Sequence, residues 1–247
     1  ARGFREIVET RWEAPLAWIG ALRARGYALP EPLPERVSDL FAPVAPQGRA
    51  ARPDDPALWR AEDSDTAFLT DRTLEALDAR RDGTWTAHVA FIRPHPPLVA
   101  PAPWNRAVDA SRAPAALAAE GAHPFLDAWA SAPTQTGLFH GFDGRCAALE
   151  PESVARLRAV YLGLLAEVDA HLGRILDWLE DRGLAERTLV VVTSDHGEML
   201  GDRAMWGKES VFAQAHRVPL LIRDPAGPRG AAVDAVTEHV DLAPTIL

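Results

Sequence analysis

Hydrophobic residues recur at intervals of three and four between residues 151 and 182, which predicts one long helix. Its inner stripe consists of Val154, Leu157, Val160, Leu164, Val168, Leu172, Ile175 and Leu179. Pro151 suits the first turn of a helix, and Gly183 suits the position just past its end. A shorter helix is expected to begin near residues 63–66, where several side chains can cap it, and to end before Gly83.

An apolar run directly after the long helix predicts a strand. Residues 188–193 read TLVVVT, and such a β-branched run is typical of a strand buried on both faces of a sheet. A helix that leads into a strand in this way is typical of a parallel sheet. Further strands are expected at 85–92, 218–223 and 233–240, and a last helix at 241–247. The pattern therefore predicts an α/β fold with a mostly parallel sheet flanked by helices.

The two ends of the chain differ in pattern. We expect residues 1–60 to form a helical and Pro-rich excursion, with a helix within 1–29 and an extended surface segment over 30–57. Residues 61–247 are expected to form the α/β catalytic part of the same domain. The chain begins without Met and stops inside an apparent helix, so we expect the domain to be incomplete at both ends.

Composition limits the kinds of partner and the location that we expect for the protein. The formal net charge of −9 argues against nucleic acid, which calls for a basic surface. No apolar run approaches the roughly 20 residues that span a bilayer, and no secretory signal opens the chain, so we expect no membrane and a cytoplasmic location. The single cysteine, Cys146, excludes an internal disulfide and is expected to be a small buried hydrophobe.

Polar residues follow the 188–193 run abruptly, at Asp195 and His196. Ligands of open α/β sheets bind just outside the carboxyl ends of strands, so this pair can supply two ligands to one metal ion. The oxygen and nitrogen donors suit Mn²⁺, Zn²⁺ or Fe better than Ca²⁺, which prefers oxygens alone. The alternative is that Asp195 caps a helix beginning at Gly197 and that His196 is a surface residue.

Two more candidates lie in loops. His95 follows the 85–92 segment within a Pro-rich turn, and a rigidly held histidine suits a general acid. Lys208 could neutralise a developing negative charge. The alternatives are a histidine that packs against prolines and a solvated surface lysine.

Taken in order, these residues resemble the later half of the sulfatase family, part of the alkaline phosphatase superfamily. The motifs are LVVVTSDHGE at 189–198, LGD at 200–202, GK at 207–208, VPLLI at 218–222 and DLAPTIL at 241–247. Upstream, SDTAF at 64–68 and RPHPP at 93–97 are most similar to the phosphonate monoester hydrolase branch, which also acts on phosphodiesters and sulfate esters.

The resemblance implies roles by position. Asp195 and His196 correspond to two ligands of a single divalent metal, which could be Mn, Ca, Zn or Fe, and His95 and Lys208 to catalytic residues that bind the transferred group and assist the leaving oxygen. The substrate would be a small anionic ester. Relatives in this branch often assemble through carboxyl-terminal segments, which leaves a homo-oligomer open.

The departures from the family pattern concern mechanism. No Cys-x-Pro-x-Arg or Ser-x-Pro-x-Arg segment is present, so this chain contains no nucleophile, and the formylglycine cofactor would belong to a missing upstream part. Cys146 lacks the following Pro and Arg. Arg203 stands where many relatives have His, and Ile92 where the closest branch tends to have Tyr.

Three functions remain open from the sequence. The first is a metal-dependent hydrolase of phosphonate monoesters or phosphodiesters, with the isolated chain inactive for lack of the nucleophile. The second is an arylsulfatase that hydrolyses sulfate esters with the same residues. The third is a non-catalytic, degenerate relative, which the joint presence of His95, Asp195, His196 and Lys208 disfavours.

Overall fold

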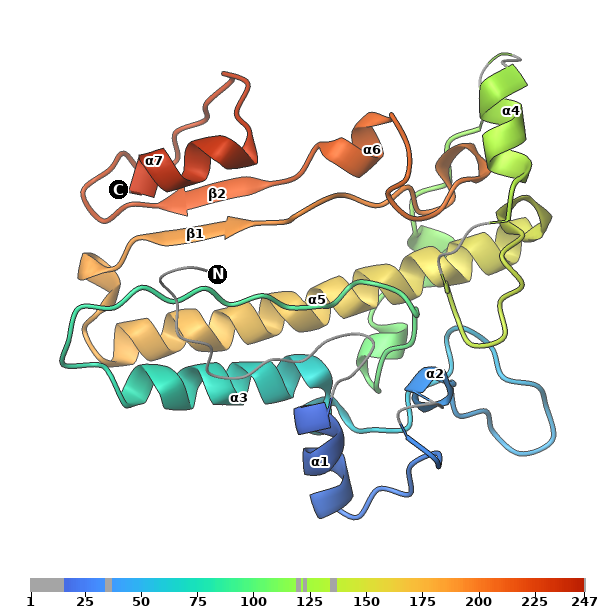
Figure 1. Cartoon of the computed structure of the whole chain (residues 1–247), viewed down its shortest axis with the longest axis horizontal. Coiled ribbons are helices and arrows are strands. Elements are labelled where there is room, and N and C mark those ends of the chain that lie inside the picture. The colour runs from blue at the N-terminus through green and yellow to red at the C-terminus, as the bar shows by residue number, and fades with distance from the viewer. Residues whose placement is uncertain (1–15, 34–36, 119–120, 122–123, 134–136, 247) are drawn as a thin grey trace.

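A computed structural model describes residues 16–33, 37–118, 121, 124–133 and 137–246 (Figure 1). The expected structure of residues 1–15 and 34–36 therefore lies outside the described residues. The α-helices and strands are α1 (Leu16–Ala24), α2 (Val37–Leu40), α3 (Asp65–Asp78), α4 (Pro124–Ser131), α5 (Pro151–Asp181), β1 (Val190–Thr193), α6 (Ala213–His216), β2 (Leu220–Arg223) and α7 (Leu242–Ile246). Short 3-10 turns occupy several of the connections between them.

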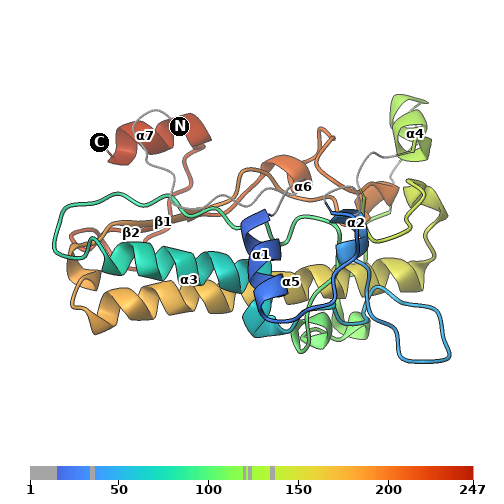
Figure 2. The ribbon, with the colours of Figure 1, turned by 60° about the horizontal axis from the view of Figure 1, so that its bottom comes forward.

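The long helix α5 and the shorter helix α3 form the centre of the structure, and both were predicted. They lie side by side in Figures 1 and 2. The Ser64 hydroxyl accepts a hydrogen bond from Ala67 N and so caps α3, as expected for a serine at this position. Leu77 of α3 and Leu179 of α5 pack in one hydrophobic cluster, which joins the two helices.

The two strands form a sheet that differs from the predicted one. β1 and β2 pair antiparallel, with Val190 opposite Arg223 and Thr193 opposite Leu220. The connection between them contains only the 3-10 turn Asp202–Ala204 and the four-residue helix α6, and it returns the chain to the end of the sheet where it left, whereas a parallel partner needs a crossover along the sheet. The expectation of burial on both faces was also wrong, since Val190 to Val192 are only half-buried and Thr193 is exposed.

Two other predicted strands are absent. Residues 84–92 run extended beside β1 in Figures 1 and 2, but they form no strand ladder, and most of them are exposed. Residues 233–238 form a loop, and residues 239–241 form a 3-10 turn before α7. Neither segment forms the backbone ladder of a strand among the described residues, and side-chain pattern alone does not supply that ladder.

The Pro-rich excursion packs on the rest of the structure. Trp18 and Leu22 of α1 share a hydrophobic cluster with Trp59 and Val99, and the Trp18 indole donates to Asp63 O at 2.8 Å. Gly26, with φ of +83°, ends the turn after α1. Among the described residues no helix combines the length and the hydropathy that a membrane span needs.

Candidate active site

The ring of His95 contacts a backbone carbonyl of its own turn. The His95 Nδ1 atom lies 2.6 Å from the carbonyl oxygen of Pro96. A carbonyl can only accept, so the neutral ring carries its proton on Nδ1 and its lone pair on Nε2. Burial lowers the pKa of His95, the Pro96 carbonyl opposes this shift, and the nearby charges of Lys208, His196 and Arg93 lower the pKa further.

Asp195 and His196 lie immediately beyond the end of β1. The Asp195 side chain is 84% exposed, and its Oδ1 accepts from His196 N at 2.9 Å. The His196 Nδ1 lies 2.8 Å from the carbonyl oxygen of Gly197, which places the lone pair of the neutral ring on Nε2. This Nε2 lies 3.6 Å from Asp195 Oδ2, so the two potential ligand atoms are close to each other.

Gly197 and Glu198 connect this turn to the rest of the site. A Cβ on Gly197 would lie 1.9 Å from the carbonyl oxygen of Gln214, so only glycine fits the close approach of the two backbones. Glu198 Oε1 accepts from Gly207 N at 2.5 Å, directly before Lys208. Burial raises the pKa of Glu198, and its backbone hydrogen bonds oppose that shift. The turn after β1 is thereby tied to the loop that carries Lys208.

Lys208 is the only lysine in a chain with 26 Lys and Arg residues. Its side chain is half-buried, and its carbonyl oxygen accepts from Ser210 N at 2.7 Å. A compact ammonium and a planar guanidinium are not interchangeable at a binding site. The one lysine of the chain thus lies at the position that the sequence predicted for neutralising a developing negative charge.

The structure brings the predicted residues together from three separate segments. His95 interacts electrostatically with both Lys208 and His196, and His196 faces Asp195. Their assignment to catalysis and metal binding remains a prediction.

The chemistry of Asp195 and His196 fits half of a metal shell. Ligand atoms that share one ion at bonds of about 2.1 Å lie roughly 3–3.5 Å apart in a tetrahedral site, close to the observed spacing of this pair. Donation of the other ring nitrogen to a backbone carbonyl, as in His196, is the usual support of a metal-binding histidine. No group of three or more His, Cys, Asp or Glu in the described part of the chain could complete the shell.

Cys146 contributes no nucleophile to this site. The thiol is buried, and burial raises the pKa of Cys146 to about 11, with the Glu198 charge as a smaller cause. A thiol held in the neutral form is a poor nucleophile. The expected structural role of Cys146 is consistent with its place in the cluster with Leu98, Leu138 and Leu157.

Two residues of this region were not singled out in the sequence. Arg93 lies inside the RPHPP motif, and its side chain donates to backbone carbonyls of the same turn. Glu198 follows the ligand pair and bridges to the Lys208 loop. No hydrophobic period marks either residue. Only their chemistry could have indicated them. Arg93 is a charged residue beside a Pro-rich turn, and Glu198 is a second carboxylate beside a predicted ligand pair.

This arrangement agrees with the family to which the chain belongs. The family model described as Sulfatase matches residues 36–247, so the chain is a member of the sulfatase family. Enzymes of this family and of the alkaline phosphatase superfamily are hydrolases that act on ester bonds and generally use a divalent metal and formylglycine.

Individual relatives show which members of the sulfatase family and its superfamily the chain is similar to. The chain is similar to a multifunctional alkaline phosphatase superfamily protein, PehA, of Trinickia caryophylli, with 33% identity over 99% of this chain and 48% of that protein. It is also similar to a choline-sulfatase of Rhizobium meliloti (strain 1021), with 30% identity over 74% of this chain and 36% of the relative.

Solved structures confirm the expected alkaline-phosphatase-like fold. The phosphonate monoester hydrolase SpPMH from Silicibacter pomeroyi superposes with a TM-score of 0.89 and 43% identity, covering 99% of this chain and 48% of that one. The phosphonate monoester hydrolase of Agrobacterium radiobacter gives a TM-score of 0.78 and 34% identity over 91% of this chain and 44% of that one. The chain thus spans about half the length of the relatives it matches.

Proposed function

We propose that the protein containing this chain is a metal-dependent hydrolase of phosphonate monoesters and phosphodiesters. The supporting observation is that Lys208 and His196 lie close enough to His95 for their charges to lower its pKa, and that His196 Nε2 lies 3.6 Å from Asp195 Oδ2. The similarity to two phosphonate monoester hydrolases favours phosphorus esters over sulfate esters. The natural substrate is then a small anionic ester.

Each residue has a distinct role in this proposal. Asp195 and His196 hold one divalent metal ion, and a bound metal would supply Lewis-acid polarisation of the ester oxygens. The ammonium of Lys208 stabilises the negative charge that develops on the transferred group. In its imidazolium form, with Nδ1–H held on Pro96 O, His95 donates the proton on Nε2 to the leaving oxygen and returns to the neutral Nδ1–H form.

The nucleophile is not among these residues. We propose that a formylglycine upstream of this chain would supply the nucleophile, as the family membership suggests. The 247-residue chain by itself is then inactive. The second candidate is a sulfatase, favoured by the choline-sulfatase relative, and the third is a protein that has lost catalysis.

Parallel assays separate these candidates. The isolated chain and the longer protein that contains it are offered matched aryl phosphonate monoester and aryl sulfate substrates. We expect no turnover by the chain and a higher kcat/KM for the phosphonate with the longer protein. A higher value for the sulfate would favour the second candidate, and no turnover of either ester by the longer protein would favour the third.

Variants of the longer protein test the assigned roles. His95→Gln and Lys208→Arg should each lower kcat by about 10²- to 10³-fold, because each removes a group used in the transition state. The exposed His88→Gln serves as the matched control and should keep the original rate. Equal rates for His95→Gln and His88→Gln would contradict the role of His95.

A further inference from the structure

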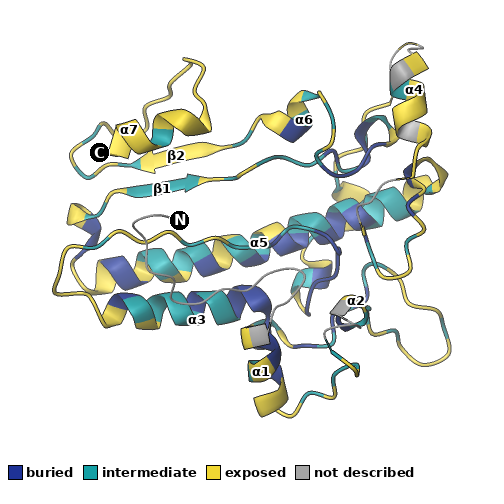
Figure 3. Ribbon diagram, in the orientation of Figure 1, coloured by how far each residue is buried: buried dark blue, intermediate teal, exposed yellow. Residues whose placement is uncertain are grey.

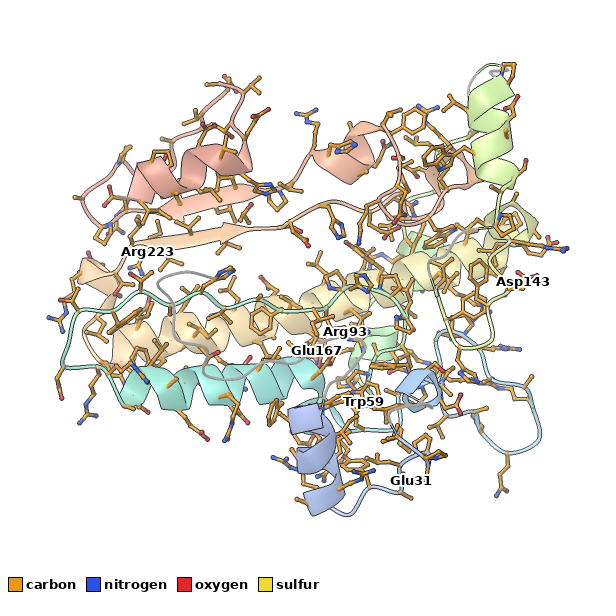
Figure 4. All side chains as sticks on the ribbon, viewed as in Figure 1. Glu31, Trp59, Arg93, Asp143, Glu167 and Arg223 are labelled. Atoms are coloured by element: carbon orange, nitrogen blue, oxygen red, sulfur yellow. The ribbon has the colours of Figure 1, made fainter. Side chains whose placement is uncertain are left out.

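A group of charged side chains is buried beneath the turn that carries His95. Asp65 of α3 is 6% exposed, Arg93 is 5% exposed, and Glu167 of α5 is 1% exposed. Figure 4 shows Arg93 and Glu167 next to one another, where the beginning of α3 meets α5. Charged side chains are almost never buried this completely unless they are paired or functional.

Arg93 connects this buried group to the backbone of the turn. Its Nε donates to Asp65 Oδ2 at 3.1 Å, on one side of the guanidinium. Its Nη1 donates to the carbonyl oxygens of His95 at 3.2 Å and Pro97 at 2.9 Å. One planar side chain therefore holds carbonyls on both sides of Pro96, and the Pro96 carbonyl in turn accepts from the His95 ring.

We propose that Arg93, fixed by Asp65, is the positioning residue that sets the orientation and tautomer of the His95 imidazole. This inference rests on the proposed role of His95. The chain of contacts runs from the Asp65 carboxylate through the guanidinium to two backbone carbonyls, and then from Pro96 O to His95 Nδ1.

A purely structural role explains these contacts less well. A buried ion pair is often no more stabilising than apolar side chains of similar volume, because both charges lose their water. An apolar replacement could fill the space of Arg93, but it could not bond two inward-facing carbonyls. Lysine would keep the charge, yet its single ammonium lacks the planar set of donors that meets Asp65 and the carbonyls together.

The tautomer of His95 can be measured without any turnover. Long-range ¹H–¹⁵N correlation spectra of the 247-residue chain distinguish the Nδ1–H and Nε2–H forms, with His95→Gln assigning the resonance. We expect the Nδ1–H form in the parent chain and a mixture of both forms in Arg93→Gln and Asp65→Asn. Arg93→Lys should give an intermediate mixture, because it restores the cation but not the planar donors.

A buried carboxylate elsewhere provides the matched control. Asp55 is 0% exposed and accepts from Arg49 Nη1 at 2.8 Å, so Asp55→Asn removes a similar ion pair. It makes none of the contacts of the His95 turn and should leave the tautomer unchanged. An Nδ1–H form that persists in Arg93→Gln and in Asp65→Asn would overturn the proposal. If Arg93→Gln does not fold, Arg93→Lys and Asp65→Asn decide the question in the same way.

The longer protein gives a second readout. Arg93→Lys and Asp65→Asn should lower kcat by about 10- to 100-fold with little change in KM, because a misplaced proton donor slows chemistry without weakening substrate binding. A rise in KM with kcat unchanged would contradict positioning of His95. If the longer protein hydrolyses no ester, the proposed function fails, while the tautomer of His95 still decides the role of Arg93.

Discussion

The two turns that build the candidate site are held in opposite ways. The turn with His95 is anchored from inside, by a buried arginine that is paired with a buried carboxylate. The turn with Asp195 and His196 makes its contacts with neighbouring backbone, and the Asp195 side chain remains 84% exposed. The proposed proton donor is therefore positioned by the interior of this chain, whereas the proposed metal ligands are positioned by local backbone geometry.

The residues that surround the two turns differ in the same way. Beneath His95, charged residues are buried between α3 and α5. On β2, hydrophobic residues are exposed, and the ribbons of β2 and most of α7 are yellow in Figure 3. Leu221 is 63% exposed and Val236 is 95% exposed. Buried charged groups and exposed apolar groups are the reverse of the usual distribution. Each should affect the free energy of unfolding in a way that can be measured.

The largest contrast is expected between two aspartates. Asp65→Ala should lower the free energy of unfolding by about 3–5 kcal/mol, because it leaves the buried Arg93 charge without its partner. Asp195→Ala should change it by less than about 1 kcal/mol, since an exposed ion pair contributes little. Urea denaturation of both variants measures the difference. Similar losses for the two variants would contradict the contrast between the turns.

The second contrast depends on pH. Burial raises the pKa of Glu167 to about 7 from its ordinary value near 4.5, with the Asp65 charge adding to the rise and Ser64 and Arg93 opposing it. The folded protein then binds more protons than the unfolded chain between these values, so stability falls as pH rises through that window. Glu167→Gln removes this loss.

The stability gain of Glu167→Gln should be small at pH 4 and reach about 3 kcal/mol at pH 8, where Glu167 is ionised in the parent chain. Urea denaturation across this range measures it. The exposed Glu180→Gln, on the same helix, is the matched control and should show no such dependence. A gain that is equal at both pH values would mean that Glu167 stays neutral or that the gain has another cause.

Local pattern predicted the helices of this structure well. The heptad-like stripe, Pro151 and Gly183 placed α5 over almost its whole observed length, and the Ser64 cap marked the start of α3. These features act within a few residues of one another. The strands were predicted less well, since residues 84–92 are extended but unpaired, and a strand exists only where another backbone completes its ladder.

The candidate site was predicted from chemistry placed next to elements. Asp195 and His196 follow a strand, and His95 follows a Pro-bounded extended segment, as expected. The supports were not predicted: the Arg93 to Asp65 contact spans 28 positions in the sequence. No periodicity links two residues that meet only after α3 and the turn have packed on α5.

The smallest stability effect is expected on the exposed sheet, with a larger effect on association. Leu221→Lys replaces an exposed apolar side chain on β2 and should change the free energy of unfolding by less than about 0.5 kcal/mol. Exposed apolar surface favours association, and a charged residue on a short edge strand opposes it. Sedimentation velocity at increasing concentration should therefore show less self-association for Leu221→Lys than for the parent chain.

Val44→Lys, at a residue 46% exposed and remote from the sheet in sequence, is the control and should associate as the parent does. Equal association of the two variants would show that the exposed face of β2 is not the surface through which copies of the chain meet.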